Sequence, residues 1–272
     1  MTNSNDIRLL DWIEGLQSRG KYAFSLQLIK QELPNYSEAG IKRGLNRLSS
    51  KSKILSIHKG YYIIIPPQYA SKGILPPSLF LDSFMKHLNR PYYLGLLNAA
   101  AYHGAAHQQP QEFFVVTNFP VLRTTNKKGI KINYISKKDV PISFTEDRKS
   151  EAGYLKISSP VLTAVDLIQF EKRIGGINRA ASVLNELSEV IKPEAFTTEF
   201  IKSTPVTTLQ RLGYILDKIL LKPVLANNLF NALMLNNPKF FRIPLKTSAP
   251  KKGFTSDERW RVIVNTQIEI DE

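Results

Sequence analysis

The chain has 272 residues, which is enough for one large domain or two ordinary ones. Its content of 43% hydrophobic and 10% aromatic residues can fill a core and excludes a disordered chain. The absence of cysteine excludes a disulfide framework, a cysteine-ligated metal or iron–sulfur cluster, and a thiol nucleophile. The apolar stretches are too short for a membrane span and the first ten residues have no signal-peptide pattern, so we expect a cytoplasmic protein.

The charge of the chain is strongly positive and unevenly distributed. The 37 Lys+Arg and 23 Asp+Glu residues give a formal net charge of +14. Counted along the sequence, residues 1–66 carry +5, residues 67–150 carry +6 and residues 151–272 only +3. A basic amino-terminal half favours a polyanionic partner such as a nucleic acid. The alternative is that these cations serve solubility alone.

The first 50 residues show three helical patterns in succession. Apolar residues recur every third position between Asp6 and Arg19, which predicts a helix that ends at Gly20. Ser25 is placed to cap a second helix, which Pro34 terminates. Ser37 is placed to cap a third helix with an apolar stripe and, on its opposite face, Lys42, Arg43, Asn46 and Arg47.

A β-hairpin is expected directly after the third helix. Two β-rich runs, 54–57 and 61–65, surround the tip His58-Lys59-Gly60. Three helices followed by a hairpin within about 65 residues is the winged-helix order, in which the third helix enters the major groove and the hairpin reaches the backbone. The predicted DNA-binding residues are the two capping serines, the polar face of the third helix and three lysines of the wing: Ser25, Ser37, Lys42, Arg43, Asn46, Arg47, Lys51, Lys53 and Lys59.

The chemistry of these residues suits DNA. Arginine and lysine can pair with guanine or phosphate, asparagine can pair with adenine, and the wing lysines would meet phosphates. The competing interpretation is a winged helix that binds protein, with its cations merely solvated.

The remaining chain predicts a mixed α/β domain with a helical-bundle portion, so the fold class is α+β. We expect a winged-helix domain at 1–67, a connector at 68–78 and a second domain at 79–272. Helices are expected at about 78–89 and 92–106, and strands at 113–117, 130–136 and 154–157, with an exposed hairpin or loop at 123–131. The later helices are predicted at 161–170, 177–190, 193–201, 205–220 and 223–235. Two strands, 240–245 and 259–270, close the predicted order.

Candidate catalytic patterns are weak. His103 and His107 have metal-binding spacing, but the glutamate of a zinc protease is missing between them. Ser83 and Lys86 fit S-x-x-K, yet the accompanying S-D-N element is absent. Glu151 stands five residues before Lys156 rather than two, as a restriction-type nuclease would need. We therefore expect a binding protein without metal or cofactor, not an enzyme.

Several stretches, taken in order, resemble the AbiEi-type antitoxins, the regulatory half of bacterial type IV toxin–antitoxin systems. They follow the winged-helix segment, which extends to about residue 66, and are Tyr92-Tyr93-Leu94-Gly95-Leu96-Leu97-Asn98-Ala99-Ala100-Ala101-Tyr102-His103-Gly104, Phe113-Phe114-Val115-Val116-Thr117, Ile157-Ser158-Ser159-Pro160-Val161-Leu162-Thr163-Ala164-Val165-Asp166-Leu167, Gly175-Gly176, Gln210-Arg211-Leu212-Gly213-Tyr214-Ile215-Leu216 and Trp260-Arg261-Val262-Ile263-Val264-Asn265. Where relatives often have an arginine–threonine pair, this chain has Leu162-Thr163.

The resemblance implies a protein that represses its own operon and opposes a toxin. Its amino-terminal domain would bind inverted repeats in promoter DNA. Its carboxy-terminal domain would counteract a nucleotidyltransferase-like toxin encoded nearby, in abortive infection against phage. The alternatives are an enzyme acting on nucleic acid with a winged helix for targeting, and a protein-interaction adaptor.

Three features of the second domain also have a plain structural interpretation. The stretch 161–170 and the stretch around Arg211 can be core helices, with Gly213 permitting a close approach. Trp260 to Asn265 alternates as a half-buried strand would. The lysines of the expected hairpin, Lys127, Lys128 and Lys131, either extend a DNA surface or lie in water.

Overall fold

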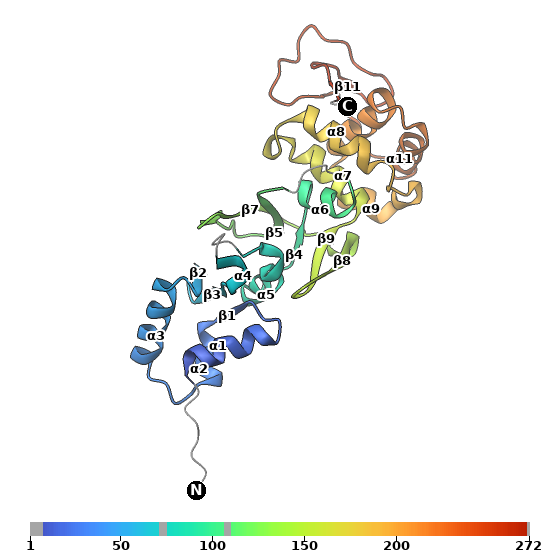
Figure 1. Ribbon diagram of the computed structural model, residues 1–272. Helices are drawn as coiled ribbons and strands as arrows, with labels where there is room; N and C mark the ends of the chain where they lie inside the picture. Colours follow the sequence, from blue (N-terminus) through green and yellow to red (C-terminus); the bar gives the residue numbers. More distant parts are fainter. Residues whose placement is uncertain (1–7, 71–74, 106–109, 271–272) are drawn as a thin grey trace. The chain divides into compact units, whose positions relative to one another are not determined.

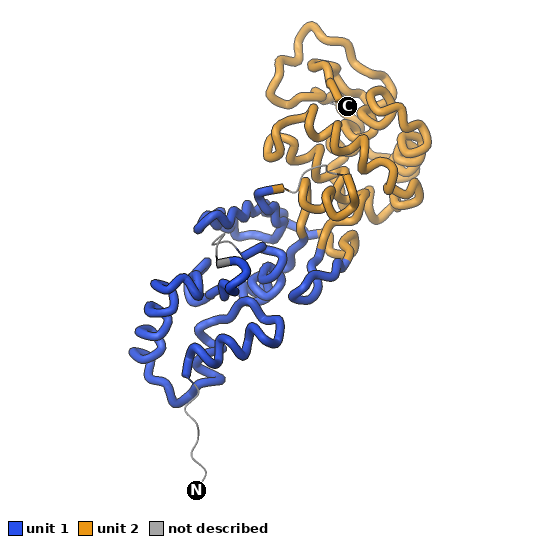
Figure 2. Tube along the Cα trace, viewed as in Figure 1, with its two compact units in different colours: residues 1–93, 111–140, 147–156 blue, residues 94–110, 141–146, 157–272 orange. Residues whose placement is uncertain are grey.

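The computed structural model describes residues 8–70, 75–105 and 110–270, and its architecture is mixed α+β, as predicted. The chain divides into two compact units (Figure 2). Unit 1 comprises residues 1–93, 111–140 and 147–156, and unit 2 comprises residues 94–110, 141–146 and 157–272. The predicted boundary at residues 67 and 68 falls inside unit 1, and part of the predicted connector, 71–74, lies outside the described residues.

Unit 1 begins with three helices and a hairpin in the order that the sequence predicts (Figure 1). The elements are α1 (Leu9–Ser18), α2 (Leu26–Glu32), α3 (Glu38–Ser50), β2 (Ile54–His58) and β3 (Tyr61–Ile64). A strand that the sequence analysis missed, β1 (Ala23–Ser25), pairs antiparallel with β3 and completes a sheet of order β1-β3-β2. Three residues are too few for a period of two to be recognised.

The two capping serines and the apolar stripes lie as predicted. The hydroxyl of Ser25 accepts a hydrogen bond from the amide of Leu28 (3.0 Å), and that of Ser37 accepts one from the amide of Gly40 (3.1 Å). Each bond satisfies an amide that the first helical turn leaves without a partner. The core under the helices is a single apolar cluster, which contains Leu16, Ile29, Phe24, Ile41, Leu45 and Leu48.

A six-stranded mixed sheet follows, with the order β6-β7-β5-β4-β9-β8. Its strands are β4 (Tyr92–Leu94), β5 (Phe113–Asn118), β6 (Thr125–Lys127), β7 (Ile130–Lys137), β8 (Thr145–Ser150) and β9 (Gly153–Ser158). The pairs β5–β7 and β4–β9 are parallel, whereas β6–β7 is an antiparallel hairpin. The prediction of an exposed hairpin or loop at 123–131 is thus confirmed.

The predicted helix at 92–106 is wrong at its start. Tyr92–Leu94 forms β4 inside the sheet, and α6 (Leu96–Tyr102) begins only after Gly95. A strand buried on both faces has the same unbroken apolar sequence as a buried helix, so periodicity cannot separate the two. The sequence analysis also missed β8, because its residues Thr-Glu-Asp-Arg-Lys-Ser have little apolar character.

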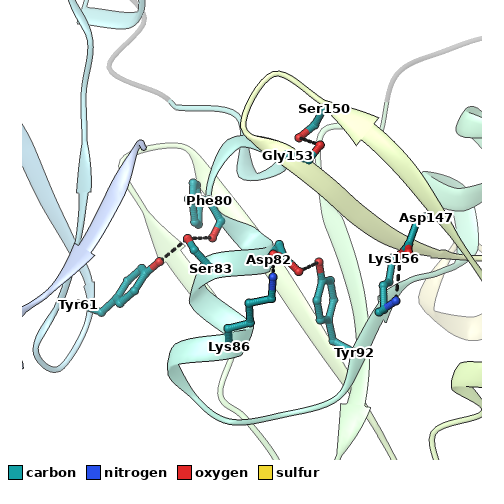
Figure 3. Close-up of polar contacts among 10 residues, drawn as sticks. All are labelled: Tyr61, Phe80, Asp82, Ser83, Lys86, Tyr92, Asp147, Ser150, Gly153 and Lys156. Atoms are coloured by element: carbon teal, nitrogen blue, oxygen red, sulfur yellow. Dashed lines mark hydrogen bonds and ion pairs between the residues drawn. The ribbon is translucent and has the colours of Figure 1, made fainter. Parts of the chain in front are cut away.

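Helix α5 (Leu81–His87) makes hydrogen bonds on two sides within unit 1 (Figure 3). Ser83 donates to the carbonyl of Phe80 (2.9 Å) and contacts the hydroxyl of Tyr61 in β3 (2.7 Å). The adjacent Asp82 accepts from the hydroxyl of Tyr92 in β4 (3.0 Å). Consecutive residues of α5 therefore connect the hairpin with the large sheet. Before α5 lie the short helix α4 (Pro67–Ala70) and a 3-10 turn at Pro77–Leu79.

Unit 2 is mainly helical. Its later helices are α7 (Pro160–Gln169), α8 (Ile177–Leu187), α9 (Thr198–Ser203), α10 (Val206–Tyr214) and α11 (Pro223–Leu235). α7 packs against α6, α8 and α10 and buries eight of its ten residues. A π-helical turn, Ile215–Ile219, follows α10. The predicted helix 193–201 is divided, because Thr197 leaves the helix and caps α9 by accepting from the amide of Phe200 (3.2 Å).

The last 30 residues form less strand than predicted. In the described residues after α11, β10 (Ile243–Pro244) and β11 (Val262–Ile263) form a short parallel pair. Elsewhere in this segment side chains form hydrogen bonds with backbone groups. The side-chain Nδ2 of Asn265 donates to the carbonyls of Lys246 (2.9 Å), Ala249 (3.2 Å) and Pro250 (3.1 Å). The predicted strands 240–245 and 259–270 are therefore wrong in length, because hydrogen bonds from side chains take the place of backbone hydrogen bonds between strands.

Candidate nucleic-acid interface

Helix α3 presents a polar, cationic face to solvent. Lys42, Arg43, Asn46 and Arg47 are all exposed, while Ile41, Leu45 and Leu48 on the other face are buried. The spacing of 42, 43, 46 and 47 places these four residues on one side of a 3.6-residue helix. In the described part of the chain, none of the four has an ion pair with an acidic side chain. Arg43 donates through Nε to the carbonyl of Ala39 (3.3 Å), which lies one turn earlier in the same helix.

Ser25 and Ser37 have a structural task at the ends of helices. Both hydroxyl oxygens accept a hydrogen bond from a helical amide, so each hydroxyl proton remains available as a donor. Their predicted contact with DNA stays a prediction.

The three predicted lysines of the wing differ in their surroundings. Lys51 and Lys59 are exposed, and Lys59 lies at the tip between β2 and β3. Lys53 lies 3.5 Å from the carboxylate of Glu14 in α1, and both side chains are about half exposed (47% and 59%). An exposed pair of this kind contributes little to stability, so a phosphate can compete for Lys53.

Two further lysines lie beside the wing and come from the large sheet. At the exposed turn between β6 and β7, Lys127 donates through Nζ to the carbonyl of Ser56 (3.0 Å), and Lys128 donates to the hydroxyl of Ser52 (3.4 Å). The sequence predicted this hairpin but could not place it next to β2, because more than 70 residues separate the partners. Lys131 instead donates a hydrogen bond to the carboxylate of Glu112. This bond lowers the pKa of Glu112, although partial burial of the carboxylate acts in the opposite direction.

Two histidines lie at the base of the wing. The ring of His87 is 4.9 Å from that of Tyr61, and the ring of His58 is 5.8 Å from that of Phe84. Partial desolvation, together with the nearby positive charge that His58 can carry, lowers the pKa of His87. His87 is therefore charged less readily than an exposed histidine.

The rejected catalytic patterns have ordinary partners in the structure. His103 lies with Nε2 2.7 Å from the carbonyl oxygen of Ser158, and His107 is outside the described residues. Lys86 of the S-x-x-K pattern forms an ion pair with Asp82 (2.7 Å), and Lys156 pairs with Asp147 (2.9 Å), as Figure 3 shows. Within the described ranges, no three His, Asp or Glu side chains are grouped so that they could hold a metal ion.

The predicted close approach at Gly213 is confirmed inside unit 2. A Cβ atom on Gly213 would lie 2.0 Å from Cζ3 of Trp260, so only glycine allows the indole to lie against α10. Trp260 is fully buried and donates through Nε1 to Asp217 (3.0 Å). Burial raises the pKa of Asp217, but this hydrogen bond and the charges of Lys218 and Arg259 outweigh that effect and lower it.

Other family-like stretches of unit 2 are also buried. Gln210 donates through Nε2 to the carbonyls of Trp260 (2.8 Å) and Phe241 (2.9 Å). Thr163, the second residue of the Leu162-Thr163 pair, is fully buried and donates to the carbonyl of Ser158 (3.2 Å). These polar residues therefore hold unit 2 together, in agreement with the core-packing interpretation.

Comparisons with known proteins agree with this architecture. No curated protein matches the chain in sequence. Among the solved structures, the RV2827C protein from Mycobacterium tuberculosis has a similar fold, with a TM-score of 0.66 over 93% of this chain and 89% of that one. The sequence identity is 16%, so this similarity concerns the fold alone. In the described residues, no helix has the length and apolarity that a membrane crossing requires.

The family assignment comes from the middle of the chain. Residues 93–218, which run from the end of β4 to the π-helical turn after α10, match the model of the AbiEi antitoxin C-terminal domain. The match covers the resembling stretches that lie between Tyr93 and Leu216, whereas the winged-helix segment and Trp260–Asn265 lie outside it, and it supports an antitoxin of a type IV toxin–antitoxin system. This match supports an AbiEi-type antitoxin family for the chain.

Proposed function

We propose that this protein is a DNA-binding autorepressor as well as an antitoxin, acting in the cytoplasm without catalysis, metal or cofactor. The observation that carries the DNA-binding part is the exposed face of α3 beside the β2–β3 hairpin, where Lys42, Arg43 and Arg47 have no acidic partner among the residues that the structure describes. Three such cations gathered on one helical face create a positive potential that attracts an anionic backbone.

In this proposal, residues 1–67 act as a winged helix. The helix α3 enters the major groove, where Arg47 or Arg43 pairs with a guanine edge and Asn46 with an adenine edge. Ser25 and Ser37 donate their hydroxyl protons to phosphates at the starts of α2 and α3, where the helix dipoles also favour an anion. These contacts separate sequence reading by α3 from positioning by its neighbours.

The wing supplies the contacts that do not depend on sequence. Lys51, Lys53 and Lys59 bind phosphates along the backbone, with Lys53 exchanging Glu14 for a phosphate oxygen. Lys127 and Lys128 add positive charge next to β2. The inverted repeats of a promoter would then be read by two copies of the chain, one on each half-site.

The second part of the proposal concerns residues 79–272. They act as the antitoxin domain and counteract a nucleotidyltransferase-like toxin encoded nearby, in abortive infection against phage. The match of residues 93–218 to the AbiEi antitoxin domain supports this assignment. The identity of the toxin and the promoter target are proposals that follow from the family and from the charged surface of unit 1.

The proposal is tested by fluorescence anisotropy on the duplex upstream of this protein's own gene. A scrambled duplex of equal length serves as the control, and both are titrated at low and near-physiological salt. We expect a preference of about a thousandfold for the upstream duplex that survives the higher salt. Equal binding that salt abolishes on both duplexes would refute autorepression. Cleavage of either duplex in the presence of Mg²⁺ would favour the enzyme alternative instead.

A further inference from the structure

Unit 2 contains an open pocket of about 350 Å³ whose lining residues lie beyond 93–218, the part of the chain that the family model matches. Three kinds of side chain meet in its walls: aromatic rings, guanidinium groups and a carboxamide. They include Phe230 and Phe240, Arg259 and Arg261, and Asn237, with Glu258 as an acidic member. A pocket of this size can hold a small ligand with the dimensions of a mononucleotide.

The positive charge of the pocket is only partly compensated within the protein. Arg259 forms an ion pair with Asp217 (3.1 Å). Glu258 pairs with Arg242 (3.2 Å), and both of these side chains are exposed. Arg261 is exposed as well, and its guanidinium has no hydrogen bond or ion pair with the residues that the structure describes. It can therefore bind an anion without first releasing an internal partner.

The aromatic wall is fixed on one side. The guanidinium of Arg259 lies 4.5 Å from the ring centroid of Phe230, and the indole of Trp260 meets the same ring edge-on at 5.4 Å. Asp217 in turn holds both Arg259 (3.1 Å) and the indole nitrogen (3.0 Å). The wall is thus preformed, which reduces the entropy lost when a planar ligand stacks on it. Phe240 is half-buried, and among the described residues no other ring packs against it.

Two lining residues have a left-handed backbone conformation. The φ angles of Asn237 and Arg261 are +46° and +52°. Asn237 follows the last turn of α11, where its amide donates to the carbonyl of Met234 (3.1 Å), so the end of the helix accounts for its conformation. No helix end accounts for that of Arg261, and arginine seldom adopts a positive φ. Residues held in such conformations are frequent at binding sites.

This combination of groups fits a nucleotide better than other anions. A base needs a flat apolar surface to stack on, which Phe230 and Phe240 offer. The edge of a base needs a donor and an acceptor, and the carboxamide of Asn237 supplies both. A phosphate needs a guanidinium without an internal partner, and Arg261 has one. A fatty acid would not use the carboxamide, and inorganic phosphate would not use the aromatic wall.

We propose that this pocket binds a nucleotide, with the base against Phe230 and Phe240, its edge bonded to Asn237 and its phosphate on Arg261. The ligand is a free mononucleotide or the terminal nucleotide of a single strand, since both present the same base and phosphate. The inference goes beyond the proposed function. DNA recognition by α3 and the antitoxin role would both stand if the pocket bound nothing.

The test is isothermal titration calorimetry of the full chain with each of the common ribonucleoside 5′-monophosphates, and with the matching nucleosides as phosphate-free ligands. We expect one-to-one binding of at least one monophosphate. Arg261→Asn should weaken it about tenfold or more, because this change removes the charged donor and keeps a residue that tolerates the left-handed backbone. Nucleoside binding should be unchanged, which a misfolded variant would not show. The matched control Lys252→Asn, at an exposed lysine between β10 and β11, should bind like the wild type.

Two further variants examine the contacts with the base. Phe240→Leu keeps an apolar side chain but removes the ring, and should weaken binding about tenfold. Asn237→Gly keeps the left-handed backbone and removes the carboxamide, so the preference among the bases should diminish while the effect of the phosphate remains. Circular dichroism verifies that each variant is folded.

A single-stranded RNA pentanucleotide with a terminal phosphate distinguishes the two sources of the ligand. Tighter, Arg261-dependent binding of the pentanucleotide would assign the pocket to a strand end, and Arg261-dependent binding of the mononucleotide alone would assign it to a free nucleotide. The proposal is overturned if neither ligand binds at millimolar concentration. It is equally overturned if Arg261→Asn binds both as tightly as the wild type, since the affinity would then belong to another surface.

Discussion

The outer face of α3 and the contact between α10 and Trp260 use polar side chains in opposite ways. On α3, the cations are exposed and have no acidic partners in the described part of the chain. Around Trp260, the Nε2 group of Gln210 and the side chains of Asp217 and Arg259 are buried or partly buried, and they are bonded to one another, to the indole or to backbone carbonyls. Groups whose bonds are satisfied within the protein stabilise its fold, whereas unsatisfied charges at the surface are available to a ligand. Substitutions in the two regions should therefore affect different measurements.

The largest effect is expected for Trp260→Ala. The indole is fully buried, contacts the ring of Phe230 edge-on (5.4 Å) and donates to Asp217, so its removal leaves a cavity and an unpaired carboxylate. We expect a loss of about 3–5 kcal/mol in the free energy of unfolding of unit 2. Denaturant unfolding followed by circular dichroism measures it. The control is Phe254→Ala, since Phe254 also lies in unit 2 and is 49% exposed. A loss no greater than that of the control would contradict the role assigned to Trp260.

Gly213→Ala should be the next largest change. The new methyl group would overlap the indole, which cannot move freely because Asp217 and Phe230 hold it. We expect a loss of about 1–3 kcal/mol in unfolding free energy. Trp260 fluorescence, in a Trp12→Phe background that leaves one reporter, would shift as the indole moves. If the two regions have separate roles, the DNA affinity of this variant should be unchanged. A loss of affinity alongside the loss of stability would contradict that separation.

Arg47→Ala should have the opposite outcome: DNA affinity should fall while stability is unchanged. The side chain is exposed and has no hydrogen bond or ion pair with the residues that the structure describes, so stability should be unchanged. If Arg47 pairs with a base, the affinity for the upstream duplex should fall by about 1–3 kcal/mol while nonspecific affinity changes less. Anisotropy on the two duplexes measures both values. Lys202→Ala, an exposed lysine of α9, is the control. Unchanged specific affinity would remove Arg47 from the interface.

Lys59→Ala should act on all sequences alike. Loss of one phosphate contact predicts that the slope of log K against log salt becomes shallower by about one, on upstream and scrambled duplexes together. Salt titrations by anisotropy provide the slopes. A change confined to the upstream duplex would instead place Lys59 at a base.

The smallest expected effect is a dependence of stability on pH at the base of the wing. The pKa of His87 is lower in the folded protein, so its contribution to stability is present above the unfolded value of about 6.5 and is lost as the pH falls through the folded pKa. His87→Gln should flatten the decrease of the unfolding temperature of unit 1 between pH 7 and pH 5. The effect is small because solvent screens the exposed ring. An unaltered pH profile would show that other groups determine it.

The sequence was most informative where short-range rules decide the structure. Ser25 and Ser37 could be recognised as caps because a short polar residue precedes an apolar helical period. The face of α3 followed from spacing alone. Gly213 was also recognisable, since a glycine inside an apolar helix indicates a close neighbour.

The sequence was least informative where the partner lies far along the chain. Tyr92–Leu94 has the composition of a buried helix, and only its neighbours in the sheet make it a strand. Nothing in the local pattern placed Lys127 beside Ser56, or Trp260 against Gly213, because tertiary packing alone brings these residues together.

The bonds that α5 makes on two sides have a practical meaning for anyone who wishes to isolate the DNA-binding segment. A fragment ending at Pro67 would lose Ser83, the partner of the Tyr61 hydroxyl, and Phe84, whose ring packs 5.1 Å from that of Tyr61. Tyr61, which is now 2% exposed, would face water at the start of β3. Extending the fragment through residue 88 retains this cover, although it also exposes the face of α5 that bonds to Tyr92. The shorter fragment should therefore aggregate or fray at the hairpin, and the longer one is the better starting point for binding work.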